Sequence, residues 1–287
     1  MTTQPTFPPE LEREIFETTA ICYPDVILTL LLVCRRVHVW ISPLLYRVLI
    51  ITAPRSTEVL AALESKPEIA LDNAVRHIFL HDISRIEDSA ILLTRCTRVT
   101  SLSFGVANLT PEFLHSLRLM HLRKLCIDVP YFAYRLGWSW NAFRHTNFSS
   151  LTHLAMFQES VWNEYPDWSE LDGLASLSSL THLALCPALA NWILHPVVKA
   201  LPCIVLFVVC AWNRPKEFTF ARYRLSVVEQ DSRVVLMAMT SQYKEDWRRG
   251  SCGGDDFWVR AEMFLARKRA GEVEATCHLI DETVESI

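Results

Sequence analysis

The sequence spells Leu-Thr-His-Leu-Ala twice, as LTHLAMF at 151–157 and as LTHLALC at 180–186. The same L-x-x-L-x-L spacing of large apolar residues recurs through the middle of the chain, at Val75–Leu80, Val99–Phe104, Leu122–Ile127, Leu151–Met156, Leu180–Leu185 and, in a weaker form, Leu201–Leu206. Successive copies begin 24, 23, 29, 29 and 21 residues apart, which lies within the range of periods that short structural repeats show. The repeated Leu-Thr-His-Leu-Ala sequence, which we call the LTHLA echo, therefore indicates an array of structural repeats.

Helix-like segments separate these copies, at 57–63, 86–96, 111–120, 168–177 and 189–200. A strand followed by a helix, repeated along the chain, predicts parallel strands with one layer of helices. One such unit cannot bury its apolar face alone, whereas several stacked units share a core. We expect an α/β solenoid with parallel strands.

The chain divides into four predicted regions. Residues 1–6 form a flexible tail, 7–52 a helical domain, 55–212 the repeat domain and 213–287 a C-terminal cap. In the cap, 223–230 and 232–239 are expected to be strands. A last helix is expected at about 256–269, with Asp255 or Asp256 as its N-cap.

Composition excludes several classes of function. A net charge of −4 argues against broad electrostatic binding to nucleic acid or to an acidic membrane, so neither is expected as a partner. The apolar runs are about half as long as a membrane-spanning helix requires. Nine scattered cysteines without a CxxC pair favour a reducing compartment, cytoplasmic or nuclear, with no disulfide framework.

The N-terminal region carries several linked residues in order: Phe7-Pro8-Pro9-Glu10-Leu11, Ile15-Phe16, Val33-Cys34-Arg35-Arg36 and Leu45-Tyr46-Arg47. This pattern resembles an F-box over roughly residues 7–50. Two positions depart from it: Val37 stands where tryptophan is usual, with Trp40 three residues later, and Thr19 stands where leucine often ends the first helix. With the degenerate repeats, the chain resembles fungal F-box proteins with irregular leucine-rich repeats. Their usual asparagine after each repeat motif is missing, which predicts an irregular, gently curved array.

The resemblance implies a substrate-recognition subunit of an SCF-type cullin–RING ubiquitin ligase. In such proteins the F-box docks on a Skp-type adaptor and through it on cullin, while the downstream domain holds a protein substrate, here unknown. The adaptor-binding positions implied are Pro8, Leu11, Ile15, Phe16, Leu32, Val33, Cys34 and Trp40. Two alternatives remain open: these residues pack on the first repeat instead, or the chain is an adaptor-independent interaction scaffold with no ligase role.

No enzymatic, cofactor or metal site is expected. Nucleotide-binding and hydrolase motifs are absent from the sequence. GGDDF at 253–257 matches the signature loop of diguanylate cyclases superficially, but a glycine turn that precedes a capped helix explains all five residues. His77 and His81 would share one face of a strand roughly 13 Å apart, too far to share an ion, so we expect exposed strand histidines.

Alternation along the strands predicts the binding face. The leucines of each repeat point to the core, so the intervening residues tile the opposite face, which would be concave in a curved solenoid. Two long loops, 130–145 and 158–168, add aromatic side chains that either bind a partner or cover the edge of the stack. The substrate-face candidates are His77, Phe79, Lys124, His153, Phe157, His182, Trp138, Trp140 and Trp162.

Overall fold

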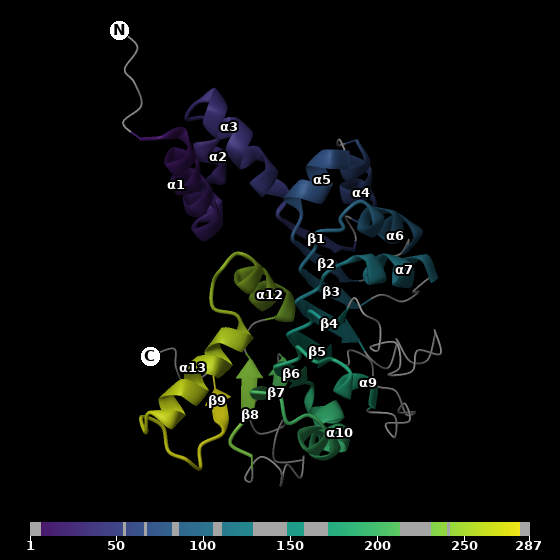
Figure 1. Ribbon diagram of the computed structural model, residues 1–287, viewed down its shortest axis with the longest axis vertical. Coiled ribbons are helices and arrows are strands. Elements are labelled where there is room, and N and C mark those ends of the chain that lie inside the picture. The colour runs from purple at the N-terminus through teal and green to yellow at the C-terminus, as the bar shows by residue number, and fades with distance from the viewer. Residues whose placement is uncertain are drawn as a thin grey trace.

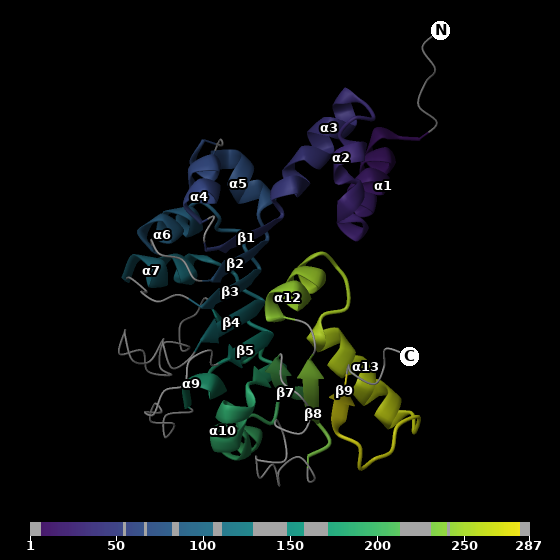
Figure 2. The same ribbon diagram turned by 180° about the vertical axis from the view of Figure 1, so that it is seen from behind.

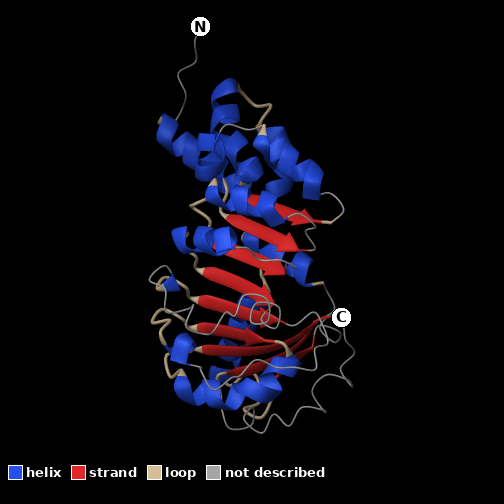
Figure 3. Ribbon diagram, turned by 90° about the vertical axis from the view of Figure 1, so that its right-hand side faces the viewer, coloured by secondary structure: helices blue, strands red, loops and turns tan. Residues whose placement is uncertain are grey.

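Nine parallel strands form one sheet, and their order across the sheet is their order along the chain (Figure 1). The structure is a computed structural model of the 287-residue chain, and it describes residues 7–53, 56–65, 68–81, 86–105, 111–128, 148–157, 172–212, 231–239 and 242–281. The strands are β1 (Val48–Thr52), β2 (His77–His81), β3 (Ser101–Gly105), β4 (Lys124–Asp128), β5 (His153–Phe157), β6 (His182–Leu185), β7 (Leu206–Trp212), β8 (Val234–Met239) and β9 (Leu279–Asp281). Figure 3 shows them stacked along the long axis of the molecule. The predicted α/β class with parallel strands is confirmed.

The register of the sheet follows the sequence repeat. Equivalent positions pair across neighbouring strands: His77 with Ser101, Ser101 with Lys124, Lys124 with His153, and His153 with His182. The two histidines of the LTHLA echo are therefore side by side on β5 and β6, as the alternation predicts.

A ladder of backbone carbonyls holds the turn before each strand. The carbonyl of Arg123 accepts hydrogen bonds from the amides of Thr152 and His153, and that of Thr152 accepts from Thr181 and His182. The same two-amide arrangement recurs at the carbonyls of Arg47, Arg76, Thr100 and Thr181. Main-chain groups thus satisfy these turns although the repeats carry no asparagine there, which keeps buried polar groups paired.

One layer of helices covers one face of the sheet (Figures 1 and 2). It comprises α4 (Ser56–Glu64), α5 (Glu68–Ala74), α6 (Ile86–Thr94), α7 (Pro111–Leu119), α9 (Asp172–Ala175) and α10 (Pro187–Ala200). The repeat leucines point toward this layer: Leu102, Leu125 and Leu154 are at most 2% exposed and share one core with Phe113 of α7. The predicted core positions are therefore confirmed.

A second pair of helices, α12 (Tyr243–Ser251) and α13 (Phe257–Arg269), lies on the other side of the sheet (Figures 1 and 2). They connect β8 to β9. A turn joins them, with Gly253 at a φ of +86°, and Asp256 caps α13 by accepting a hydrogen bond from the Val259 amide at 3.0 Å. The predicted glycine turn, N-cap and final helix are confirmed.

The N-terminal helices form a separate small unit at one end of the array (Figure 1). It contains α1 (Pro9–Cys22), the 3-10 turn η1 (Pro24–Val26), α2 (Ile27–Leu30), α3 (Arg35–Ile41) and the 3-10 turn η2 (Ser42–Tyr46). Its own core consists of Ala20, Ile27, Val37 and Ile41, apart from the core of the repeats. Within the described ranges, no helix has the length and apolar character that a membrane crossing requires.

Several elements differ from the sequence expectation. Residues 48–52, assigned to the helical region, form β1 and begin the sheet, because VLIIT alternates between the helix layer and the opposite face. Helix α5 was not predicted. The segment 232–239 is a strand as expected, but it extends the same parallel sheet as β8. The tail at 1–6, the expected strand at 223–230 and residues 168–171 lie outside the described residues.

Candidate functional site

The N-terminal unit carries an unusual amount of exposed apolar surface. The described residues include thirteen large apolar side chains that are exposed. Nine of these lie within residues 7–45: Phe7, Leu11, Ile15, Tyr23, Leu28, Leu32, Val33, Val39 and Leu45. Leu32 is 86% exposed and Leu28 is 68% exposed. A concentration of exposed apolar side chains on a small unit is typical of a protein-interaction site. We call these nine side chains the apolar docking surface.

Most of the predicted adaptor-binding positions belong to this unit's outer surface. Pro8, Leu11, Ile15, Leu32, Val33 and Cys34 are exposed, so the alternative in which they pack on the first repeat is wrong for these six. Phe16 and Trp40 are half-buried against the unit's own core. Val37 is fully buried, and its methyl groups fill the centre of the helical unit.

The predicted binding face of the sheet is covered. Phe79 packs against Trp247 of α12 with ring centroids 5.3 Å apart, and Phe157 packs against Tyr243 at 5.1 Å. Phe79 is 3% exposed and Phe157 is 8% exposed. The expectation of an open face is therefore wrong at these positions, because the C-terminal segment lies along the face instead of capping only the end of the array.

The strand histidines are covered too. Trp258 of α13 places its ring edge against His153 and His182, with centroids 5.1 and 5.9 Å away. His81 is buried and its Nε2 lies 3.1 Å from the Ser103 hydroxyl. The expectation of exposed strand histidines is wrong, again because the crossover between β8 and β9 runs over this face.

Polar contacts hold the two C-terminal helices together and in place. The Lys124 ammonium on β4 lies 3.0 Å from the Asp256 carboxylate, 132 residues away in the chain. Asp246 is fully buried in α12, accepts the Phe257 amide at 2.9 Å and pairs with Arg260 at 2.6 Å. Burial raises the pKa of Asp246, although the Arg260 guanidinium opposes that shift.

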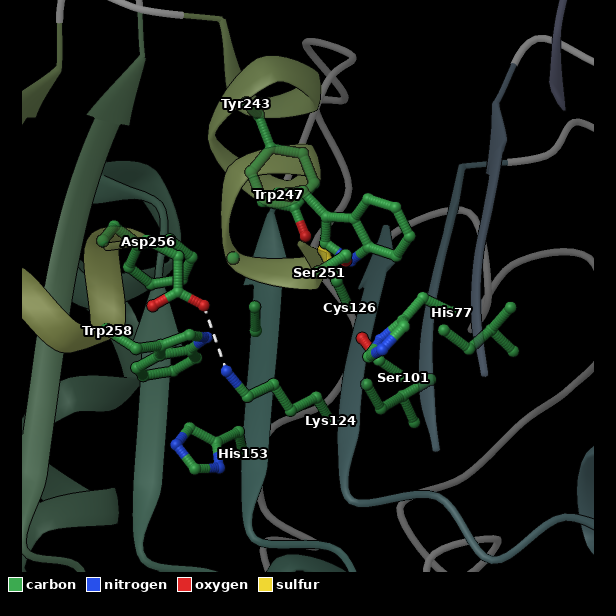
Figure 4. Close-up of a pocket in the computed structure, with 15 residues that line it drawn as sticks. His77, Ser101, Lys124, Cys126, His153, Tyr243, Trp247, Ser251, Asp256 and Trp258 are labelled. Carbon is green, nitrogen blue, oxygen red and sulfur yellow. Dashed lines mark hydrogen bonds and ion pairs between the residues drawn. The ribbon is translucent and has the colours of Figure 1, made fainter. Parts of the chain in front are cut away.

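A small cavity of about 100 Å³ remains between the sheet and these helices (Figure 4). His77, Lys124, His153, Tyr243 and Asp256 are among the residues that line it. A space of this size holds several water molecules. Typical ligand pockets measure about 300–1,000 Å³, so this one is small by comparison.

Burial controls the protonation of the groups around this cavity. It lowers the pKa of His77 to about 4 and that of His153 to about 3, with further lowering by neighbouring cations in His77 and by His182 and Lys124 in His153. Burial also lowers the pKa of His182, against the opposing effect of Glu262. The Tyr243 pKa is raised well above its usual value by burial. The imidazoles are therefore neutral near pH 7.

Three potential metal ligands lie close together: the histidines of the two LTHLA copies, on β5 and β6, and Glu262 on α13. The rings of His153 and His182 stack with centroids 4.2 Å apart, and His182 Nε2 lies 2.8 Å from Glu262 Oε1 on α13. One ligating atom from each of these three residues lies within 4.8 Å of the others. Pairing of the histidines follows from the sequence period, whereas Glu262 carries no sequence signal because it lies 80 residues from His182.

The aromatic loop residues Trp138, Trp140 and Trp162 lie outside the described residues, so their part in partner binding stays a prediction. Comparison with family models, with curated proteins and with solved structures gives no match.

Proposed function

We propose that the protein is a substrate-recognition subunit of an SCF-type cullin–RING ubiquitin ligase. In this proposal the N-terminal unit binds a Skp-type adaptor, and the rest of the chain binds a protein substrate. The observation that carries it is the apolar docking surface, which includes four of the eight positions through which the F-box resemblance implies adaptor contact: Leu11, Ile15, Leu32 and Val33.

The contrast between the two parts of the chain supports a partner at the N-terminus. Helices cover both faces of the repeat sheet, and almost all side chains of its described strands are buried. The N-terminal unit instead buries four apolar residues in its own core and leaves nine large ones outside. Full burial of one such side chain is worth about 1.5–3 kcal/mol, so a partner that covers several of them has a strong driving force.

The helical unit is rigid enough to present that surface. Arg36 of α3 lies 2.6 Å from the Glu12 carboxylate of α1, and its guanidinium stacks 5.9 Å from the Trp40 ring centroid. The Arg36–Glu12 ion pair joins α1 to α3, and the Arg36–Trp40 contact lies within α3, while Leu11 and Ile15 on α1 and Leu32 beyond α2 stay exposed. A preformed surface binds with less loss of conformational entropy than a flexible one.

Co-expression with a Skp-type adaptor followed by size-exclusion chromatography tests the proposal. We expect wild type to co-elute with the adaptor and Leu32→Asp to elute alone, because the aspartate places a charge within an apolar interface. Leu32 is 86% exposed, so the substitution leaves the core intact. Ile91→Asp on α6 is the matched control, since Ile91 is a 51% exposed side chain of the repeat domain.

Elution of the wild type without the adaptor overturns the proposal and favours an adaptor-independent interaction scaffold. Unchanged co-elution of Leu32→Asp with the adaptor would place the contact outside the apolar docking surface. Circular dichroism of each variant confirms that the comparison is made between folded chains.

A further inference from the structure

We propose that His153, His182 and Glu262 form a binding site for a divalent first-row transition metal such as Zn²⁺. The three residues come from β5, β6 and α13, and one ligating atom of each lies within 4.8 Å of the other two. Two imidazoles and one carboxylate are a ligand set that suits zinc, with a fourth position left for water.

The distances are close to those of a bound ion. Zinc–nitrogen and zinc–oxygen bonds of about 2.0–2.2 Å at tetrahedral angles place neighbouring ligand atoms roughly 3.4 Å apart. His182 Nε2 and Glu262 Oε1 are 2.8 Å apart, and no pair among the three exceeds 4.8 Å. The required adjustments are therefore about 1.4 Å or less. Glu262 is half-exposed at the surface of α13, so its carboxylate has room to move.

The threonine of each LTHLA copy orients its histidine. Thr152 Oγ1 lies 2.8 Å from His153 Nδ1, and Thr181 Oγ1 lies 2.7 Å from His182 Nδ1. Each hydroxyl also donates to the carbonyl of the preceding rung, Thr152 at 3.0 Å and Thr181 at 3.3 Å. A hydroxyl has one proton, so a threonine that donates to the carbonyl accepts from Nδ1–H. This tautomer leaves the lone pair on Nε2, the arrangement that outer hydrogen bonds impose on metal-binding histidines.

With this tautomer, two hydrogen-bond acceptors face each other at His182, and a positive charge between them would be favourable. If Thr181 accepts from Nδ1–H, the neutral ring presents a lone pair on Nε2, only 2.8 Å from a carboxylate oxygen that is also an acceptor. A cation between the two atoms removes that conflict. Lys124 does not fill this role, because its ammonium is paired with Asp256 at 3.0 Å.

The surroundings allow access from one side. Trp258, one turn before Glu262 on α13, covers both imidazoles with its ring edge. The side chain of Glu262 is 52% exposed, whereas that of His182 is 10% exposed, so an ion enters past the carboxylate. The stacked rings lie within 10° of parallel, and binding therefore requires them to tilt about their Cβ–Cγ bonds until both Nε2 atoms converge on the ion.

Titration of the full chain with Co²⁺ and Zn²⁺ tests the site. The chain is first stripped with a chelator, and N-ethylmaleimide blocks the exposed thiols of Cys22, Cys34 and Cys203. We expect one equivalent of Co²⁺ to give visible ligand-field absorption, and one equivalent of Zn²⁺ to abolish it. His182→Gln and Glu262→Gln should remove this absorption. Thr181→Val retains all three ligands and should weaken Zn²⁺ binding about 10–100-fold, the usual effect of losing an outer hydrogen bond.

His77→Gln is the matched control, because His77 lies on the same sheet face but outside the three-residue cluster. Retention of the one-equivalent cobalt spectrum in His77→Gln and its loss in His182→Gln support the site. Absence of saturable binding in wild type overturns it, and so does an unchanged spectrum in His182→Gln. Side-chain NMR of wild type keeps the test decisive if a variant fails to fold: Zn²⁺ must shift the His153 and His182 ring resonances and leave those of His77 unchanged.

Discussion

The ion pair between Lys124 and Asp256 predicts a measurable coupling between the sheet and the C-terminal helices. Asp256→Asn removes the charge but keeps a residue that caps helices about as well as aspartate, so α13 retains its N-cap. Lys124→Met removes the ammonium and keeps most of the apolar stem. The double-mutant cycle built from these two variants isolates the pair itself.

The expected coupling follows from the geometry. At 3.0 Å, Coulomb's law gives about 1.4 kcal/mol in water and about 5.5 kcal/mol at an effective dielectric constant of 20. The Asp256 side chain is 8% exposed and that of Lys124 is 38% exposed, so solvent screens the pair from one side and desolvation offsets part of the attraction. We expect a coupling free energy of about 1–2 kcal/mol.

Equilibrium urea denaturation of wild type, the two single variants and the double variant measures this coupling. The analysis requires that fluorescence and circular dichroism give coincident transitions, the condition for a two-state free energy. Raising the salt concentration should reduce the coupling only in part, because one partner is buried. A coupling below about 0.3 kcal/mol, which is within the error of additivity, would refute the docking of α13 on β4.

Three further predictions concern the core, the cavity and the turn. Phe113→Ala should lower the free energy of unfolding by about 3–5 kcal/mol in urea denaturation, because Phe113 is fully buried with its ring 5.2 Å from that of Phe104; a loss below 1 kcal/mol would contradict this packing. The folded-state pKa of His77 is lowered to about 4 by burial and by Arg47, Lys124 and Arg76, so the unfolded chain binds a proton that the folded chain does not between pH 6.5 and 4. The free energy of unfolding should therefore fall as pH falls through this window. Over the same pH range His77→Asn should lose about 3 kcal/mol less of that free energy than wild type. Identical losses in the two proteins would show that His77 is not buried in its neutral form. Gly253→Ala should cost about 1–2 kcal/mol, since Gly253 has a φ of +86° and no atom within 4 Å of an added Cβ, and an unchanged midpoint of unfolding would contradict that turn conformation.

The repeat period was sufficient to predict the middle of the fold. Strands of a stacked array bury the same positions in every copy, so the L-x-x-L-x-L spacing gave both the strands and their register, down to the contact between His153 and His182. The capped helix after GGDD was predicted for an equally local reason, because Asp256 and the preceding glycines determine a turn and a helix start without reference to the rest of the chain.

The covering of the sheet face was not predictable in the same way. Tyr243, Trp247 and Trp258 meet strand residues that precede them by 86, 168 and 105 residues, and no period in the sequence links them to their partners. One signal was available: Phe79 and Phe157 are large apolar residues at positions expected to face solvent. Strands of parallel sheets buried on both faces carry apolar residues at both alternating sets of positions.

The late position of α12 and α13 in the chain has a consequence for biosynthesis. At a synthesis rate of about 5–20 residues per second, the 132 residues that separate Lys124 from Asp256 take roughly 7–26 s to add. During that interval the nascent sheet exposes Phe79, Phe157 and its histidine row to solvent without their helical cover. Emerging strands with bare apolar faces are the surfaces that chaperones bind and that aggregate with other nascent chains. The yield of folded protein should therefore depend on chaperone supply until the last helices are made.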